Sequence, residues 1–373
     1  VKVGIIDGGF EGFGNLLGGE LPSTVVARCY TAVGVHNSNL ANCQTDGVHG
    51  TAVAETIVDV APGVQLYIAN PFSSGDALST VHWMADQGVE VINMSLGWIW
   101  DGPGDGHAYF SNSPTAFVDV AVSRGITWIN SAGNEGLSGW FGPFRDDDGD
   151  GYHEVNSSGV EVYNVQLQSG RRSTFQLRWD DSWGVAAKDI DFGLFFGENL
   201  VAMSANEQSG SSGHYPIEVI SYTPQSSGNY YLVVLRYSGA LPAWIQVNAF
   251  SGEPLDPRTV GYTMGNPGES ANPGLLAVGA SYWASPNSTE SFSSRGPTPD
   301  GRVKPDVVGA DGGTTVSYPS GFYGTSQASP HVAGIAALVV QRFPHFTPQQ
   351  VASYVESNAL PRGSTPNNTW GYG

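Results

Sequence analysis

The sequence predicts an α/β protein in which a doubly wound parallel sheet is split by an inserted antiparallel β-sandwich, or jelly-roll, domain. Up to about residue 134, apolar runs such as VKVGII and ITWINSA alternate with segments of helical length, which is typical of a parallel sheet. Between about residues 140 and 257 the runs become short, aromatic and β-branched, and small polar residues divide them. That pattern predicts a sandwich of about seven or eight strands. The parallel pattern returns after residue 257.

The elements of the parallel sheet can be placed in order along the chain. We expect strands at 1–6, 64–69, 89–93, 126–132 and 274–282, and helices at 49–60, 76–88, 114–125 and 329–343. The expected domain limits are 1–140 for the first part of the α/β domain, 141–256 for the insertion and 257–373 for the second part. The closing GSTPNNTWGYG is expected to be a loose tail.

Charge and cysteine content restrict the setting and the partners. The chain has 34 acidic and 15 basic residues among 373, a formal charge of −19, which disfavours nucleic acid and anionic membrane surfaces as partners. No apolar run approaches the roughly 20 residues that span a bilayer, and the chain opens directly in a strand, as a processed form would. Cys29 and Cys43 bracket a polar stretch, so we expect a disulfide rather than two free thiols, and with it a secreted protein.

Four polar residues occupy ends of strands or starts of helices, where α/β proteins bind ligands. Asp7 ends the first strand, and Asn134 follows the strand ITWIN. His49 begins a helix, whose dipole would keep the imidazole neutral as a general base requires, and Ser326 begins the last apolar helix, where the dipole favours an oxyanion. Each residue alone also fits a turn or a helix cap. Their coincidence on one sheet favours catalysis.

At these residues the sequence resembles the subtilisin-like serine protease family. Asp7 in GIIDGG, His49 in HGTAVAE, Asn134 in SAGNEG and Ser326 in GTSQASPHVAG follow the order of the family, across about 1–140 and 257–373. The resemblance implies a subtilisin-type fold and a serine endopeptidase in which Ser326 is the nucleophile, His49 the base, Asp7 its orienting partner and Asn134 an oxyanion donor, with no cofactor in catalysis.

The same resemblance implies where a protein or peptide substrate lies. It implies that one edge of the substrate channel is formed by Ser95, Leu96 and Gly97. It also implies that the pocket for the residue before the cleaved bond is lined by Ala132 and Gly133. The chain departs from the family where Gln327 replaces the usual Met after the nucleophile, and where Ala52 and Glu55 replace a His and a Gly. These changes bear on packing and specificity, because they remove no catalytic atom.

The insertion begins with an acidic run, RDDDGDGYHE, that resembles the start of a calcium loop of the EF-hand type. Carboxylates at alternate positions can converge on a hard cation, and the twelfth position is Ser157 where that loop has Glu. The proposed structural calcium ligands are Asp146, Asp148, Asp150, the Tyr152 carbonyl and Glu154. A solvated acidic turn is the alternative.

Two other functions remain open at this stage. The insertion, which resembles jelly-roll modules of secreted bacterial proteases, could gate the cleft of a processing protease with narrow specificity. Alternatively, an inactive protease fold could serve as a binding scaffold, although every catalytic position holds the required residue type.

Overall fold

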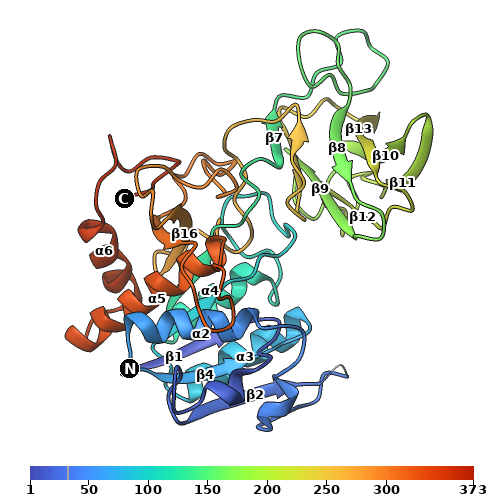
Figure 1. The fold of residues 1–373 in the computed structure, drawn as a ribbon. Coiled ribbons are helices and arrows are strands. Elements are labelled where there is room, and N and C mark those ends of the chain that lie inside the picture. Colours follow the sequence, from blue (N-terminus) through green and yellow to red (C-terminus); the bar gives the residue numbers. More distant parts are fainter. Residues whose placement is uncertain (32) are drawn as a thin grey trace. The chain divides into compact units, whose positions relative to one another are not determined.

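The computed structural model describes residues 1–31 and 33–373. These residues form two compact units, one of Val1–Asn134 with Met264–Gly373 and one of Glu135–Thr263. The predicted fold class is confirmed, because the first unit holds a largely parallel sheet with helices and the second holds two antiparallel sheets (Figure 1). The unit limits lie a few residues from those expected at 140/141 and 256/257.

The first unit is built on an eight-stranded sheet in the order β17-β16-β6-β5-β1-β4-β2-β3. All neighbouring pairs are parallel except β2 with β3. The strands are β1 (Lys2–Ile6), β2 (Val25–Tyr30), β3 (His36–Asn37), β4 (Gln65–Ala69), β5 (Val91–Met94), β6 (Thr127–Ser131), β16 (Leu275–Tyr282) and β17 (Val307–Asp311). The helices are α1 (Phe13–Leu16), a 3₁₀ turn η1 (Leu40–Asn42), α2 (His49–Val60), α3 (Ser74–Asp86), α4 (Pro114–Ser123), α5 (Thr325–Arg342) and α6 (Pro348–Asn358).

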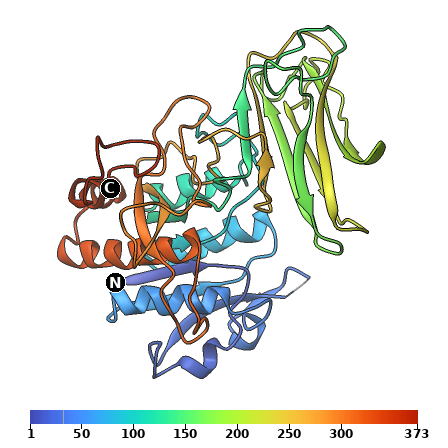
Figure 2. The same cartoon turned by 45° about the horizontal axis from the view of Figure 1, so that its top comes forward.

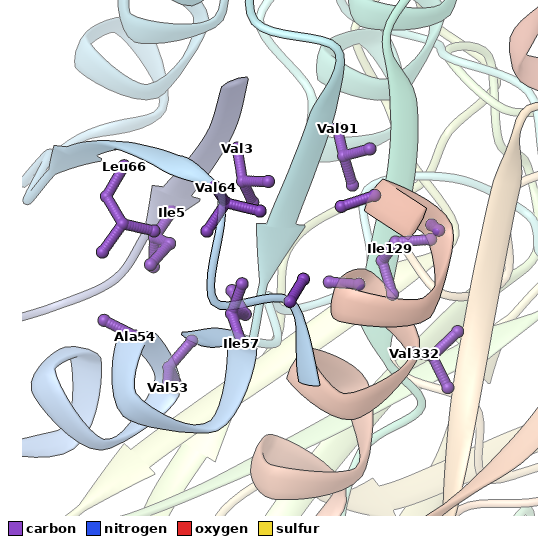
Figure 3. Close-up of a cluster of buried hydrophobic side chains, with 14 of the residues drawn as sticks. Val3, Ile5, Val53, Ala54, Ile57, Val64, Leu66, Val91, Ile129 and Val332 are labelled. Atoms are coloured by element: carbon purple, nitrogen blue, oxygen red, sulfur yellow. The ribbon is translucent and has the colours of Figure 1, made fainter. Parts of the chain in front are cut away.

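Both faces of this sheet are buried, as a parallel sheet with helices on each side requires. Helices α2 and α5 cover one face, where Val3 and Ile5 of β1 pack with Ile57 and Val332 (Figure 3). Helices α3 and α4 cover the opposite face, where Ile6 of β1 packs against them. Strand β1 therefore runs through the centre of the unit, and its carboxyl end carries Asp7.

The second unit is a sandwich of a five-stranded sheet, in the order β11-β10-β13-β8-β15, and a four-stranded sheet, β12-β9-β14-β7 (Figure 2). Their strands are β7 (Gly139–Gly142), β8 (Tyr163–Leu167), β9 (Ser173–Trp179), β10 (Asp189–Phe196), β11 (Asn199–Ser204), β12 (Ile217–Tyr222), β13 (Gly228–Ser238), β14 (Ile245–Ala249) and β15 (Leu255–Asp256). The strand number exceeds the seven or eight expected, because β7 and β15 are short pieces without an alternating sequence pattern. Inward side chains of both sheets form one apolar core.

Two local expectations can be compared with the chain directly. The disulfide between Cys29 and Cys43 is present, and both residues are buried. The expectation of a loose tail is wrong. The Gly373 carbonyl accepts a hydrogen bond from the Val308 N–H at 3.0 Å, and the Tyr372 N–H donates to the Asp306 carbonyl at 2.8 Å, so the tail is fixed beside β17. None of the described helices is long and apolar enough to cross a membrane.

Candidate active site

Asp7 and His49 form a directly bonded pair at the carboxyl end of β1. The Asp7 side chain is 1% exposed, and its two oxygens lie 2.9 and 2.8 Å from the His49 Nδ1. The Asp7 backbone N–H donates to the Ala69 carbonyl, and the Gly8 N–H donates to the Asp7 carboxylate at 2.8 Å. Asp7 is thereby fixed on both sides, and its position sets the tautomer with the proton on Nδ1 of His49, which leaves Nε2 free to accept a proton.

The charge environment of His49 differs from the sequence-based expectation. Burial opposes the cation, but the negative charge of Asp7 and its hydrogen bond outweigh burial, so the pKa of His49 is raised above its ordinary value. The helix dipole was expected to keep the imidazole neutral, and that effect is outweighed. Phe322 lies against the His49 ring, edge-on, with the ring centroids 5.5 Å apart.

Ser326 lies in the first turn of α5, after the glycine that caps the helix. Gly324 has φ 119° and ψ 163°, a conformation that residues with a Cβ rarely adopt, so the turn into the helix depends on glycine. The Ser326 hydroxyl donates to the Ser95 carbonyl at 3.4 Å, and the Ser95 hydroxyl donates to the Ser326 carbonyl at 3.0 Å. This rotamer points the Ser326 hydroxyl at β5, and nucleophile–base hydrogen bonds often tighten only when substrate binds.

Asn134 lies beside the turn that carries Ser326. Its side-chain oxygen accepts hydrogen bonds from the backbone N–H and from the hydroxyl of Thr325, both at 3.0 Å. Because the oxygen is engaged in this way, the amide nitrogen is the atom left to donate. A Cβ at Gly324 would lie 3.4 Å from that nitrogen, so the Asn134 amide adjoins the turn that carries Ser326.

The residues expected to bind substrate flank the same turn. Ser95 is buried, Leu96 is half-buried and Gly97 is exposed in an extended segment after β5. The Ala132 N–H donates to Val278, and the Gly133 N–H donates to the Thr325 hydroxyl at 3.3 Å. Ser95 and Gly133 therefore contact the turn that carries Ser326, and Gly97 is exposed to solvent.

Three polar side chains, those of Asp311, Gln327 and Glu55, hold loops of this unit through contacts that the sequence did not predict. Asp311, at the end of β17, accepts the Gly324 N–H at 3.0 Å. Burial raises the pKa of Asp311 to about 6, in spite of that hydrogen bond and with a further increase from Glu290. Gln327 holds Gly313 through both ends of its amide, accepting the N–H at 2.8 Å and donating to the carbonyl at 3.0 Å.

Glu55 of α2 likewise holds a loop, the segment that contains Val316 and Ser317. Its buried carboxylate accepts the N–H groups of Val316 and Ser317, and also the Ser317 hydroxyl at 2.5 Å. Glu55 and Gln327 are two of the positions where the sequence departs from the family pattern. Those departures were a usable signal, but only the fold shows what the side chains contact.

The acidic loop of the second unit brings its alternate carboxylates together. One oxygen each from Asp146, Asp148 and Asp150 lies within 4.8 Å of the others. The buried Glu154 carboxylate accepts the Asp147 N–H at 3.0 Å, and Tyr152 is exposed. Burial would raise the pKa of Asp146, but hydrogen bonds, first from the Gly151 N–H and then from Arg236, lower it.

The structure thus holds a bonded Asp–His pair and a serine at a helix start within one α/β unit. The Subtilase family profile matches residues 1–373, and the chain belongs to this family of subtilisin-like serine proteases. It is 25% identical over 360 residues to the minor extracellular protease Vpr of Bacillus subtilis, covering 84% of this chain and 42% of Vpr. It is 37% identical over 269 residues to subtilisin amylosacchariticus of Bacillus subtilis subsp. amylosacchariticus, covering 68% and 60%.

The chain therefore spans about half the length of the curated relatives that it matches. Among solved structures, the CspB protease of Clostridium perfringens superposes with a TM-score of 0.70 at 16% identity, covering 100% of this chain and 92% of that one. At that identity the likeness concerns the fold alone.

Proposed function

We propose that this protein is a serine endopeptidase that hydrolyses peptide bonds through Ser326, His49 and Asp7. The observation that carries the proposal is the bond from buried Asp7 to His49 Nδ1. The His49 ring also packs on Phe322, four residues before Ser326, which lies in the first turn of α5. An imidazole held this way has Nε2 available as a base. Burial without such a partner would have lowered the pKa of His49 instead.

The proposed reaction has two steps. In the first, the Ser326 hydroxyl oxygen attacks the scissile carbonyl carbon while His49 Nε2 takes the hydroxyl proton, and the carbonyl oxygen becomes an oxyanion. The Asn134 amide and the Ser326 backbone N–H would donate to that oxyanion. The carbon–nitrogen bond then breaks as His49 protonates the leaving amine. In the second step water, deprotonated by His49, attacks the acyl-enzyme and releases the acid and Ser326.

Labelling with a fluorophosphonate probe tests this proposal without a known substrate. The intact chain should be labelled, Ser326→Ala and His49→Ala should both lose the label, and Ser326→Ala should keep its melting temperature. Asn134→Ala should still be labelled but should cleave peptides about 10²–10³-fold more slowly. A folded chain that takes no label would contradict the proposal and favour a binding scaffold. Cleavage across a peptide library then measures specificity, and one dominant motif would indicate a processing protease.

We also propose that the acidic loop binds a structural calcium ion through Asp146, Asp148, Asp150, the Tyr152 carbonyl and Glu154. Three carboxylates within 4.8 Å offer the hard oxygen ligands that calcium takes. The Gly151 backbone has φ 93°, which permits the turn of such a loop. A bound ion would replace the pairing of Asp146 with Arg236, now at 3.2 Å.

Removal of calcium tests this second proposal. Calcium at about a hundred times its dissociation constant would stabilise the folded chain by about 2.7 kcal/mol. We expect chelator to lower the melting temperature of the parent chain, and Asp148→Asn to remove the response. Glu198→Gln, an exposed change in the same unit, is the control and should keep it. If chelator leaves the melting temperature of the parent chain unchanged, the loop is a solvated acidic turn.

We further propose that the protein is secreted. The buried disulfide supports this, because disulfides persist in oxidising compartments. The relative Vpr is described as an extracellular protease. A secreted form with Cys29 and Cys43 oxidised, detected in culture medium by alkylation and mass spectrometry, is the expected result, and accumulation of the reduced chain inside cells would contradict it.

A further inference from the structure

Part of the outer face of the five-stranded sheet in the second unit, on β10 and β13, is apolar, although the solvent side of a sandwich sheet usually alternates to polar residues. Phe192 of β10 and Leu232 of β13 point into the core and are fully buried. Their neighbours on the opposite face are Phe195, Tyr231 and Val233. Phe195 and Tyr231 are directly paired across the two strands, so both side chains project from that face.

This face forms a shallow groove beside the acidic loop. The groove has a volume of about 410 Å³ and is walled by Tyr152, Val162, Phe195, Tyr231 and Val233, with Glu161 as its one carboxylate wall among the described residues. Tyr152 reaches the face because it pairs with Leu235 of β13. On the neighbouring strand β11, Leu200 and Met203 are 50% and 49% exposed, so apolar surface continues past the groove.

Continuous apolar surface of this kind marks a site of interaction. We call these five wall residues together with Glu161 the outer groove.

Charge indicates the chemistry of the occupant. Glu161 adjoins four carboxylates of the acidic loop, those of Asp150, Asp148, Glu154 and Asp146. Three of these lie within 4.8 Å of one another, and like charges at such distances repel. One cation, Arg236, is paired with Asp146 in this cluster. Even with a calcium ion bound, five carboxylates would exceed the charge of one arginine and one divalent ion. A positively charged group at Glu161 would relieve this repulsion.

We propose that the outer groove docks an extended segment of the polypeptide substrate that carries a basic side chain next to apolar or aromatic ones. The ring faces of Phe195 and Tyr231 would contact the aliphatic stem and the neighbouring apolar residue, and Glu161 would pair with the cationic head. The negative charge beside the groove repels nucleic acid. This inference rests on the proposed endopeptidase activity, since it concerns how that substrate is held.

Binding and cleavage are measured separately so that the two proposals can fail independently. For binding, Ser326→Ala prevents cleavage, and the probe is a fluorescein-labelled peptide rich in lysine and phenylalanine, measured with calcium present. The comparison peptide has every lysine replaced by glutamate. Glu161→Gln and Tyr231→Ser are introduced singly, and Leu241→Ser, which removes a 51% exposed apolar side chain outside the outer groove, is the matched control.

We expect the lysine peptide to bind, and both groove variants to weaken it by about tenfold, the effect of losing one desolvated cation contact. The control variant Leu241→Ser should bind the lysine peptide as the parent chain does. The glutamate peptide should not bind. In the active chain, Glu161→Gln should lower kcat/KM for the lysine peptide but not for a short peptide nitroanilide. Equal binding of both peptides, or unchanged binding in both groove variants, would overturn the inference. If the parent chain does not cleave the nitroanilide at all, that result would count against the proposed endopeptidase function.

Discussion

Gly50, the residue after the proposed base, is expected to tolerate no side chain, and Gly50→Ala tests how closely the site is packed. A Cβ at Gly50 would lie 2.7 Å from the Gly9 carbonyl oxygen, 2.7 Å from the Phe10 ring and 2.9 Å from the Asp7 Cβ. Comfortable contacts begin near 3.4 Å, so helix α2 and the turn after β1 would have to separate by about 0.7 Å. The Gly50 N–H also donates to the Gly9 carbonyl at 2.9 Å, which ties these two segments together.

That separation acts directly on the proposed catalytic pair, Asp7 and His49. The His49–Asp7 distances of 2.8 and 2.9 Å would lengthen toward 3.5 Å, the limit of a hydrogen bond. A misplacement of this order costs about a hundredfold in rate, and overpacking costs about 1–3 kcal/mol of stability, partly offset by the better helix propensity of alanine. We expect fluorophosphonate labelling and peptide cleavage to slow by about a hundredfold and the melting temperature to fall.

The matched control for this prediction is Gly63→Ala, because a Cβ at Gly63 meets no atom within 4 Å. Its labelling rate should stay unchanged. A Gly50→Ala variant that labels and melts like the parent chain would show that the turn adapts freely, and the packing argument would be wrong.

Three further substitutions have expected outcomes. Asp7→Asn should lower the cleavage rate by about 10⁴-fold and move the acid limb of the pH–rate profile to lower pH, because the charge that raises the pKa of His49 is lost; an unmoved limb would contradict this. The pKa of Asp311 is raised to about 6, so its contribution to stability is full below its unfolded pKa near 4 and is lost as pH rises through 6. The melting temperature of Asp311→Asn should therefore lack this pH dependence. The same pH dependence in the variant and in the parent chain would contradict the prediction. Replacing Cys29 and Cys43 by serine should cost about 3 kcal/mol, measured by urea unfolding, and no shift would show that the polar loop is ordered without its bond.

The local sequence was sufficient to predict the fold class because the decisive patterns are short. The helix expected at 49–60 is the helix observed, and the four strands expected before residue 134 match within a few residues. The proposed catalytic residues could be selected because each one ends a strand or begins a helix. Positions of that kind are visible in a single segment and need no knowledge of what packs against it.

Contacts between distant segments could not be predicted in this way. Glu55 holds Val316 and Ser317 from 261 and 262 residues away, and Asp311 and Gln327 act on loops that only the complete sheet brings close. The tail had the composition of a loose segment, yet Gly373 and Tyr372 hydrogen-bond beside β17. Composition reports what a segment lacks, such as apolar residues, but not the backbone donors that a neighbouring strand offers to it.

The pKa of His49 shows why even a correct local rule can give a wrong net result. A helix N-terminus disfavours a cation by about 0.3–1 kcal/mol, so the sign inferred from sequence was right for that one effect. A carboxylate about 4 Å from the charge is worth on the order of 4 kcal/mol at the effective dielectric of a protein, several times more. Asp7 lies against His49 Nδ1, and the pKa of His49 is raised. The proposed base thus owes its proton affinity to the strand end, whereas the helix mainly sets its position.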